Sequence, residues 1–472
     1  MRRMSEIPAE LLAEMTPAVR VFVESLLVQM ADMQAEIEDL KAQVKRLTPQ
    51  NSSVPPSTQH PHARHVAHPR AKSKNKRGGQ LGHRRVVREL VPLERCAEVI
   101  AVHPQNCRRC GHELRGCDPK PIRHQVWELP KIEPIIVEYQ RHRLTCGCGT
   151  TTCAVLPSGV PTGQFGARLL AFTGLLMGHF RQSKRRAASF LSDLLNMPCC
   201  PASMVKMQNR VSEALEQPYE DLKARLAHES HLFMDESPTK QAHQKAWLWT
   251  AVASTYAVFA IFASRAATAL PKLRGDQFRG IIHCDRAKMY WRAQRLQWCW
   301  AHLKRDIQAL IDHHDPQVKR LGFDLMRSVK AMFLLWHQYK SDSIPWETFQ
   351  SEMQPVRDQV NNLLLRGVFS GNPRLTGMCR ELYNHREWLW TFVEVQGLEP
   401  TNNTAERALR PAVIYRKLSF GTQSESGSHF LERMLTVSET CRLQKRSVFQ
   451  WLTAAVEANL RSELAPSLLG GT

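Results

Sequence analysis

His231-Leu232-Phe233-Met234-Asp235 and Gly280-Ile281-Ile282-His283-Cys284-Asp285 are short apolar runs that each end in an aspartate, and they decide the fold of this 472-residue chain. Between them, residues 247–253 and 256–262 are rich in Val, Trp, Phe, Ile and Tyr, which predicts two buried strands joined as a hairpin. Residues 266–274 predict a short helix. The order is strand, hairpin, helix, strand, and we expect the fourth strand to run parallel to the first.

Acids on the first and fourth strands are typical of a ribonuclease-H-like α/β core. In that layout Asp235 and Asp285 lie side by side at two strand ends, where the sheet exposes them. Carboxylates in such a place can bind a hard cation such as Mg²⁺. Two unrelated exposed acids are the alternative interpretation, since acids at strand ends are ordinary features taken singly.

A third acid, Glu406, opens a predicted helix in Asn402-Asn403-Thr404-Ala405-Glu406-Arg407. Three carboxylates brought together could hold two metals about 3.5–4 Å apart for phosphodiester chemistry, which indicates an enzyme that cuts nucleic acid. If Asn403 caps the helix, Glu406 could instead close a capping box. Basic residues that suit a phosphate backbone follow it within twelve residues: Arg407, Arg410, Arg416 and Lys417.

The composition favours a polyanionic partner. The net charge is +20 and the pI about 9.6, which suits phosphate binding through counterion release but also an anionic membrane surface.

No signal peptide is expected at Met1. The uncharged stretch from Ala246 to Ser264 is as long as a membrane span, but Ser254-Thr255 interrupts it, so we predict two strands there. We expect a cytoplasmic, nucleoid-associated protein without a membrane partner.

Residues 1–47 predict a coiled-coil, leucine-zipper-like helix. Apolar residues alternate spacings of four and three without a break: Val19, Val23, Leu26, Met30, Met33, Ile37, Leu40, Val44 and Leu47. Mostly β-branched a positions with mostly Leu d positions favour a parallel two-stranded coil, hence a homodimer. An amphipathic helix packed on its own protein is the alternative.

Residues 48–88 predict a disordered basic linker, since residues 51–57 have turn composition and residues 64–88 contain no acid. A flexible cationic segment suits contact along DNA, although a solvated tail would look the same. The candidate DNA-binding residues are Lys72, Lys74, Lys76, Arg77, Arg84 and Arg85.

Residues 89–160 predict a zinc-ribbon domain. Two close cysteine pairs could fill a tetrahedral Zn²⁺ site: Cys107, Cys110, Cys146 and Cys148. Residues 126–129 and 135–139 between the pairs predict strands. Cys153 or Cys117 could replace one ligand, and a metal-free cluster of reduced cysteines is the alternative.

Residues 161–225 predict a helix-turn-helix-like region. Residues 182–191 predict one helix, Asn196-Met197-Pro198 a break, and residues 202–210 a second helix. This order is compatible with a helix that reads DNA, and equally with plain helix packing.

The chain resembles the transposases of the insertion sequence 66 family over nearly its whole length. The resemblance rests on the N-terminal zipper and several motifs: residues 76–83, the four paired cysteines, Asp235-Glu236-Ser237-Pro238, residues 299–305, residues 402–411, and Arg416-Lys417 before Gly421. It implies a DDE recombinase whose acids are Asp235, Asp285 and Glu406. It also implies a multidomain α+β protein whose core, residues 226–300 and 400–472, carries a helical insertion at residues 301–399.

The resemblance implies a transposase of a bacterial-type insertion sequence. It would bind element-terminal inverted repeats and target DNA, and cut and transfer strands with Mg²⁺ or Mn²⁺, aided by accessory proteins of the same element. Ser237 stands where the family usually has Thr, Arg286-Ala287 stands where it usually has Gly-Tyr, and Glu236 is a possible substitute for Asp235. The alternatives are an inactive or domesticated DNA-binding derivative, or a ribonuclease-H-like nuclease without strand transfer.

Overall fold

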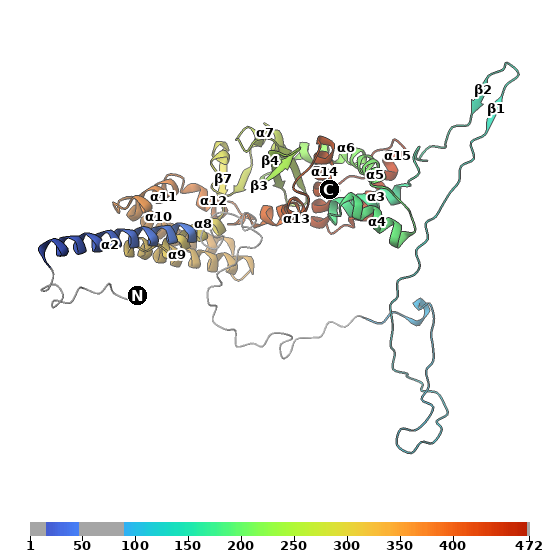
Figure 1. Ribbon diagram of the computed structural model, residues 1–472, viewed down its shortest axis with the longest axis horizontal. Coiled ribbons are helices and arrows are strands. Elements are labelled where there is room, and N and C mark those ends of the chain that lie inside the picture. Colours follow the sequence, from blue (N-terminus) through green and yellow to red (C-terminus); the bar gives the residue numbers. More distant parts are fainter. Residues whose placement is uncertain (1–15, 47–88, 470–472) are drawn as a thin grey trace. The chain divides into compact units, whose positions relative to one another are not determined.

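The computed structural model describes residues 16–46 and 89–469 (Figure 1). The chain divides into two compact units, Pro61–Ile135 and a larger unit formed by Met1–His60 with Ile136–Thr472. The predicted disordered linker, its six candidate DNA-binding residues and Leu47 of the predicted coiled coil lie outside the described residues.

The predicted zipper segment forms one helix, α2 (Pro17–Arg46). Five apolar side chains at its heptad positions are between 42% and 58% exposed: Val19, Leu26, Met30, Met33 and Ile37. The helical part of the prediction is confirmed, and pairing with a second copy stays a prediction.

The cysteine-bearing segment contains little regular structure. It has a short helix, η2 (Leu93–Arg95), and a hairpin of β1 (Arg143–Thr145) and β2 (Thr151–Cys153). The strands predicted at residues 126–129 and 135–139 are wrong, because both segments are irregular and mostly exposed. β-branched composition indicates only that a segment suits a sheet; a strand also needs a neighbour for its backbone hydrogen bonds.

A five-stranded sheet is the centre of the larger unit. Its order is β5 (Ala257–Phe262), β4 (Gln244–Val252), β3 (His231–Gln241), β6 (Ile281–Cys284) and β7 (Arg295–Trp298). β3, β4 and β5 are antiparallel neighbours, while β6 is parallel to β3 and β7 to β6. The four predicted strands are confirmed, and so is the helix before the fourth, α7 (Ala269–Arg274). The short β7 was not predicted.

Helices cover both faces of this sheet. On one face, Phe233, Leu248 and Phe259 pack against apolar residues of α13 (Asn403–Ser419) and α14 (Glu425–Leu443). On the other, Met234, Trp249 and neighbouring residues join the large core that includes α7 and α8 (Trp300–Ile311). The side chains alternate between the faces as a strand requires.

Helix α14 also provides hydrogen-bond acceptors for backbone N–H groups of the edge strand β5. Three side chains of α14 accept hydrogen bonds from alternate backbone N–H groups of β5: Ala257 donates to Thr440 (3.2 Å), Phe259 to Thr436 (3.0 Å) and Ile261 to Glu432 (2.5 Å). Four residues of helix rise about 6 Å, close to the rise of two strand residues. The match brings a distant helix against an otherwise unpaired sheet edge.

The predicted helical region before the sheet packs with the C-terminal helices. It consists of α3 (Ala167–Gly174), η3 (Leu175–His179), α4 (Lys184–Leu195), α5 (Pro201–Ala214), α6 (Glu216–Arg225) and η4 (Leu226–His228). The predicted break is confirmed at Asn196, whose φ is 52°. Arg433 of α14 donates to the Ser212 carbonyl at 2.9 Å and to Glu216 at 2.6 Å, and α15 (Val448–Leu460) packs on α3 and α5. A role in reading DNA stays a prediction.

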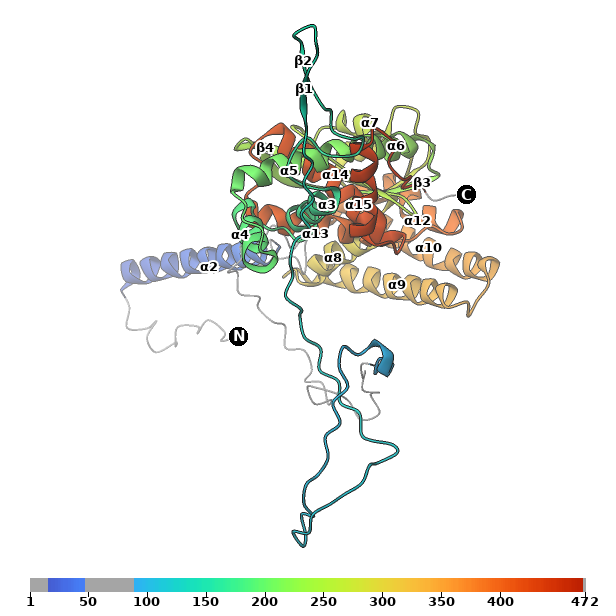
Figure 2. The same cartoon turned by 90° about the vertical axis from the view of Figure 1, so that its right-hand side faces the viewer.

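The predicted insertion is helical, as expected. Between β7 and α13 come α8, α9 (Pro316–Lys340), α10 (Trp346–Val368), α11 (Pro373–Asn384) and α12 (Glu387–Glu394). Helices α9 and α10 lie side by side (Figure 2). In the part of the chain that the structure describes, no helix combines the length and apolar character needed to cross a membrane.

Candidate active site

The sheet brings Asp235 and Asp285 together. In the parallel register of β3 and β6, Phe233 pairs with His283, and continuing the register by two residues puts Asp235 level with Asp285. Asp285 directly follows β6, as predicted. Asp235 does not end its strand, because β3 continues to Gln241 by pairing with β4. The predicted strand end at Asp235 is therefore wrong, although the predicted neighbourhood is right.

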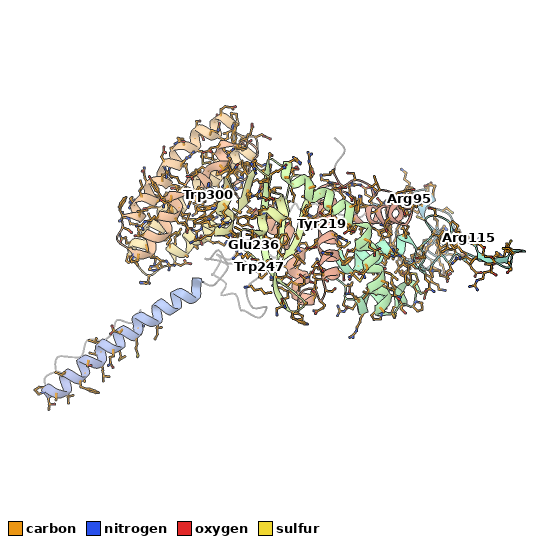
Figure 3. The ribbon with its side chains drawn as sticks, turned by 90° about the horizontal axis from the view of Figure 1, so that it is seen from above. Arg95, Arg115, Tyr219, Glu236, Trp247 and Trp300 are labelled. Carbon is orange, nitrogen blue, oxygen red and sulfur yellow. The ribbon has the colours of Figure 1, made fainter. Side chains whose placement is uncertain are left out.

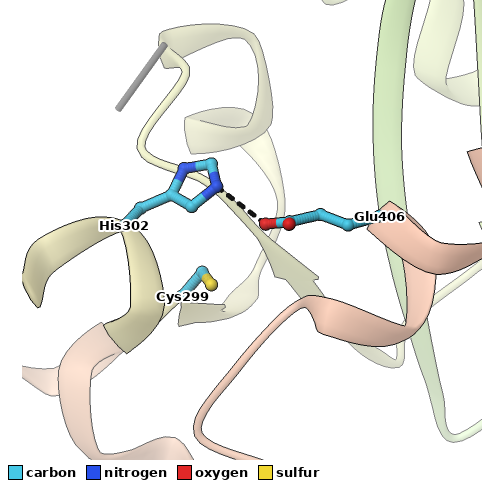
Figure 4. Close-up of side chains that lie close together, drawn as sticks. All are labelled: Cys299, His302 and Glu406. Carbon is cyan, nitrogen blue, oxygen red and sulfur yellow. Dashed lines mark hydrogen bonds and ion pairs between the residues drawn. The ribbon is translucent and has the colours of Figure 1, made fainter. Parts of the chain in front are cut away.

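Helix α13 carries Glu406 to the same face of the sheet. Residues of this helix pack with Phe233, which lies two positions before Asp235 and therefore on its face. Oε1 of Glu406 lies 2.8 Å from Nε2 of His302 in α8 (Figure 4) and 3.9 Å from Arg305. The capping-box alternative fails, because the helix is capped at Asn402, without a side-chain cap bond, and the Glu406 carboxylate contacts α8.

The charges of Asp285 and Glu406 act on the third acid, Asp235. Burial raises the pKa of Asp235 well above its usual value, and the charges of Glu236, Asp285 and Glu406 raise it further. Burial would also raise the pKa of Glu406, but the hydrogen bond with His302 and the charges of His302, Arg305 and Arg410 outweigh it and lower the pKa. Glu406 therefore has cationic support, whereas Asp235 is crowded by other acids. A divalent cation would relieve that crowding, and carboxylate oxygens are ligands that Mg²⁺ prefers.

Glu406 also belongs to a second set of residues that could bind a metal ion. Among the described residues, Cys299, His302 and Glu406 form the one trio whose potential ligand atoms all lie within 4.8 Å of one another. Burial raises the pKa of Cys299 to about 11, which keeps the thiol protonated. Its Sγ accepts a hydrogen bond from the Asn402 backbone N–H at 3.1 Å. This chemistry suits a support for Glu406 better than a metal site.

Asn402 ties the start of α13 to the strand that carries Asp235. It is buried, and its Nδ2 donates to the carbonyl of Met234 at 2.7 Å. The bond joins the residue before Asp235 to a residue four positions before Glu406. Of the two adjacent asparagines in the sequence motif, Asn402 therefore has a structural role, whereas Asn403 is exposed.

We expect Asn402→Ala to lower the free energy of unfolding by about 1–3 kcal/mol, because it leaves the buried Met234 carbonyl without its donor. Urea unfolding monitored by circular dichroism measures the change. Asn403→Ala removes an exposed amide from the neighbouring position and serves as the control. Equal effects of the two substitutions would contradict the assigned role of Asn402.

Arg286, which follows Asp285, is held by the helical insertion. Its Nη2 lies 2.8 Å from Asp306 of α8, and its Nη1 lies 3.0 Å from Glu381 of α11. The guanidinium is thus neutralised by two carboxylates that sequence reasoning did not identify. Its charge is engaged there instead of being free beside Asp285.

Glu236 faces away from Asp235. It accepts from Arg265 Nε at 2.8 Å and from the Tyr290 hydroxyl at 2.6 Å. Arg265 also lies over the ring of Trp247, at 5.0 Å from its centroid; Figure 3 labels Glu236 and Trp247. Because its carboxylate is committed to these partners, the structure does not support Glu236 as a substitute for Asp235.

Three of the four basic residues predicted on the Glu406 helix are exposed: Arg407, Arg410 and Lys417. Arg416 instead turns back to β3, where it donates to the Ser237 hydroxyl at 3.0 Å and to the Pro238 carbonyl. Arg416 therefore ties helix to sheet. Sequence reasoning marks Arg305 only as the last residue of the motif at residues 299–305, yet the side chain lies 3.9 Å from Glu406.

Each predicted zinc-binding pair forms its own tight turn. The Gly111 N–H donates to the Cys107 carbonyl, and the Gly149 N–H to the Cys146 carbonyl, both at 2.8 Å. Hydrogen bonds from the backbone near Cys110 lower the pKa of Cys107, and a hydrogen bond with Thr150 lowers that of Cys148 to about 7. Both shifts favour the thiolate that zinc binds. The first pair lies in residues 61–135 and the second in the larger unit, so a joint site stays a prediction.

Comparison with known proteins identifies the family. A protein called "Uncharacterized protein y4qI", from Sinorhizobium fredii, is 23% identical over 407 residues, which cover 76% of this chain and 72% of the relative. The model of the family described as "Transposase IS66 family" matches residues 162–429, more than half of the chain. The match spans the sheet, the helical insertion and all three acids. The chain therefore belongs to the IS66 family of transposases.

Proposed function

We propose that this protein is an active transposase that cuts DNA at the ends of an insertion sequence and joins those ends to target DNA, with Asp235, Asp285 and Glu406 as its catalytic acids. One observation carries the proposal: a strand register and a packed helix, from three distant parts of the chain, bring these carboxylates within electrostatic range of one another.

The acids would hold Mg²⁺ or Mn²⁺, and two bound metals stabilise the entering and leaving oxygens of a phosphodiester exchange. Asp235 and Asp285 supply carboxylate oxygens from adjacent strands. Glu406 supplies a third carboxylate, whose orientation His302 and Arg305 hold from α8. Arg407 and Arg410, exposed on the same helix, would neutralise phosphate charge.

The remaining parts would serve binding and assembly. The basic segment before residue 89, a zinc site built from the four cysteines and the α4–α5 pair would bind the inverted repeats and target DNA. Helix α2 would join two protomers, so that two ends are held together, and accessory proteins of the element would assist. We expect the protein to act at the nucleoid in the cytoplasm.

The test is cleavage of a DNA that carries the element's terminal repeats. We expect purified protein with Mg²⁺ to release a 3′-hydroxyl end and to join it to a second duplex, and Asp285→Ala to bind the same DNA without cutting it. Asp276→Ala, at an exposed acid between α7 and β6, should cut normally. Products without joining would indicate a nuclease, whereas binding without cutting by the unmodified protein would indicate a DNA-binding derivative.

A further inference from the structure

The far end of the Glu406 helix carries an exposed aromatic ring. Phe420, the residue that directly follows α13, is 77% exposed and has a φ of 59°. Along the helix, the exposed residues recur at spacings of four and three and so form one stripe: Asn403, Arg407, Arg410, Ile414 and Lys417. Leu418 beside Lys417 is 63% exposed. The stripe therefore runs from the active-site end of α13 to an apolar tip.

The backbone around Phe420 is held firmly in place. Next to it, Gly421 has a φ of 107°, and a Cβ there would collide with the Lys240 carbonyl, so the segment needs glycine. Thr422 then donates to the Lys240 carbonyl, and its own carbonyl accepts from Ala242, both at 2.9 Å. These bonds fasten the segment to the turn between β3 and β4. A ring on such a support loses little conformational freedom when it binds a partner.

The charge around the ring indicates the partner. Glu406 is the single acid of α13, and the exposed stripe carries Arg407, Arg410 and Lys417. Lys240, exposed at the end of β3, adds another cation. Cations beside an aromatic side chain are the combination by which proteins hold a nucleic-acid backbone and stack on a base. In duplex DNA, such apolar side chains insert between base pairs and kink the helix.

We propose that Phe420 is a wedge that inserts into a base step of the duplex lying along α13. The rise of the helix puts Phe420 roughly 20 Å from Glu406, which corresponds to about six base pairs of DNA. The inserted step would therefore lie about six base pairs from the bond that is cut. The inference rests on the proposed function in taking duplex DNA as the ligand. It adds a contact that recognises how easily a base step of the DNA is deformed, and not the hydrogen-bonding groups on the base edges.

The test uses terminal-repeat duplexes with 2-aminopurine placed at single positions from three to nine base pairs from the cut. Binding is measured without divalent metal, so no strand is cut. We expect fluorescence to rise at a position about six base pairs away, and Phe420→Ala to remove the rise and weaken binding about tenfold. Phe420→Trp should keep both. Phe369→Ala is the matched control, because Phe369 also directly follows a helix, α10, and is 81% exposed.

Several outcomes would overturn the wedge. Tight binding without a fluorescence rise at any position would do so, as would an unchanged rise in Phe420→Ala. Loss of self-association in Phe420→Ala with an unchanged rise would assign the ring to a protein contact instead. DNA cutting is assayed separately. If the protein cuts DNA normally but no base is unstacked, the wedge is rejected and the catalytic proposal stands. If a base is unstacked but DNA is not cut, the catalytic proposal is rejected and the wedge stands. Circular dichroism and thermal unfolding confirm that each variant is folded.

Discussion

Asp235→Asn is expected to reduce Mg²⁺-dependent DNA cleavage at least about a thousandfold, because a metal-bound carboxylate is worth several kcal/mol of transition-state stabilisation. The same substitution should raise the melting temperature without metal by about 2–4 °C. Burial and the charges of Glu236, Asp285 and Glu406 raise the pKa of Asp235, so the ionised form is disfavoured in the folded protein. Asparagine is neutral and can still accept the Glu236 N–H that Asp235 accepts at 2.9 Å.

Added Mg²⁺ distinguishes a metal-binding role of Asp235 from a purely structural one. A cation that binds only the folded protein raises the melting temperature, so we expect Mg²⁺ to stabilise the unmodified protein and to have little effect on Asp235→Asn. Differential scanning fluorimetry with and without Mg²⁺ measures both shifts. Asp276→Asn, an exposed acid, should behave like the unmodified protein. A variant that still cuts, or that keeps the full Mg²⁺ shift, would disprove the assignment of Asp235.

His302→Ala is expected to slow cleavage about 10- to 100-fold, the usual cost of losing a group that orients a metal-binding side chain. The 2.8 Å contact with Nε2 of His302 holds Oε1 of Glu406, and Arg305 lies at 3.9 Å from the same oxygen. Without the imidazole, we expect the carboxylate to turn toward Arg305. The variant should then need a higher Mg²⁺ concentration for half-maximal rate, and His302→Gln, which keeps a donor, should recover part of the loss.

The dependence of rate on Mg²⁺ distinguishes orientation of Glu406 from simple support of the fold. Loss of folded protein lowers the amount of active enzyme but leaves the half-maximal Mg²⁺ concentration unchanged. His337→Ala, at an exposed position of α9, is the control and should leave both quantities unaltered. An unchanged Mg²⁺ requirement in His302→Ala would refute a role in positioning Glu406.

Local patterns were enough for most of the core. Apolar runs of strand length are bounded by turn residues or acids, so the four predicted strands and the helix before the fourth could be located from composition and spacing. The motif around Glu406 likewise marked a candidate site residue. Residues 126–129 and 135–139 carry similar strand-forming residues but lack a neighbouring strand. Composition could not distinguish the two cases, because strand formation depends on partners distant in sequence.

The sequence by itself located four of the five strands of the central sheet and the helical insertion between Asp285 and Glu406, and it selected three acids as candidates. Only the tertiary structure decided what those acids touch. The register of β3 and β6 puts Asp235, in the middle of β3, level with Asp285. His302 contacts Glu406. Arg286 and Arg416 contact other residues of the protein. The physical reason is that local sequence sets which face of a strand or helix a side chain occupies, whereas its contacts depend on which distant element packs against that face.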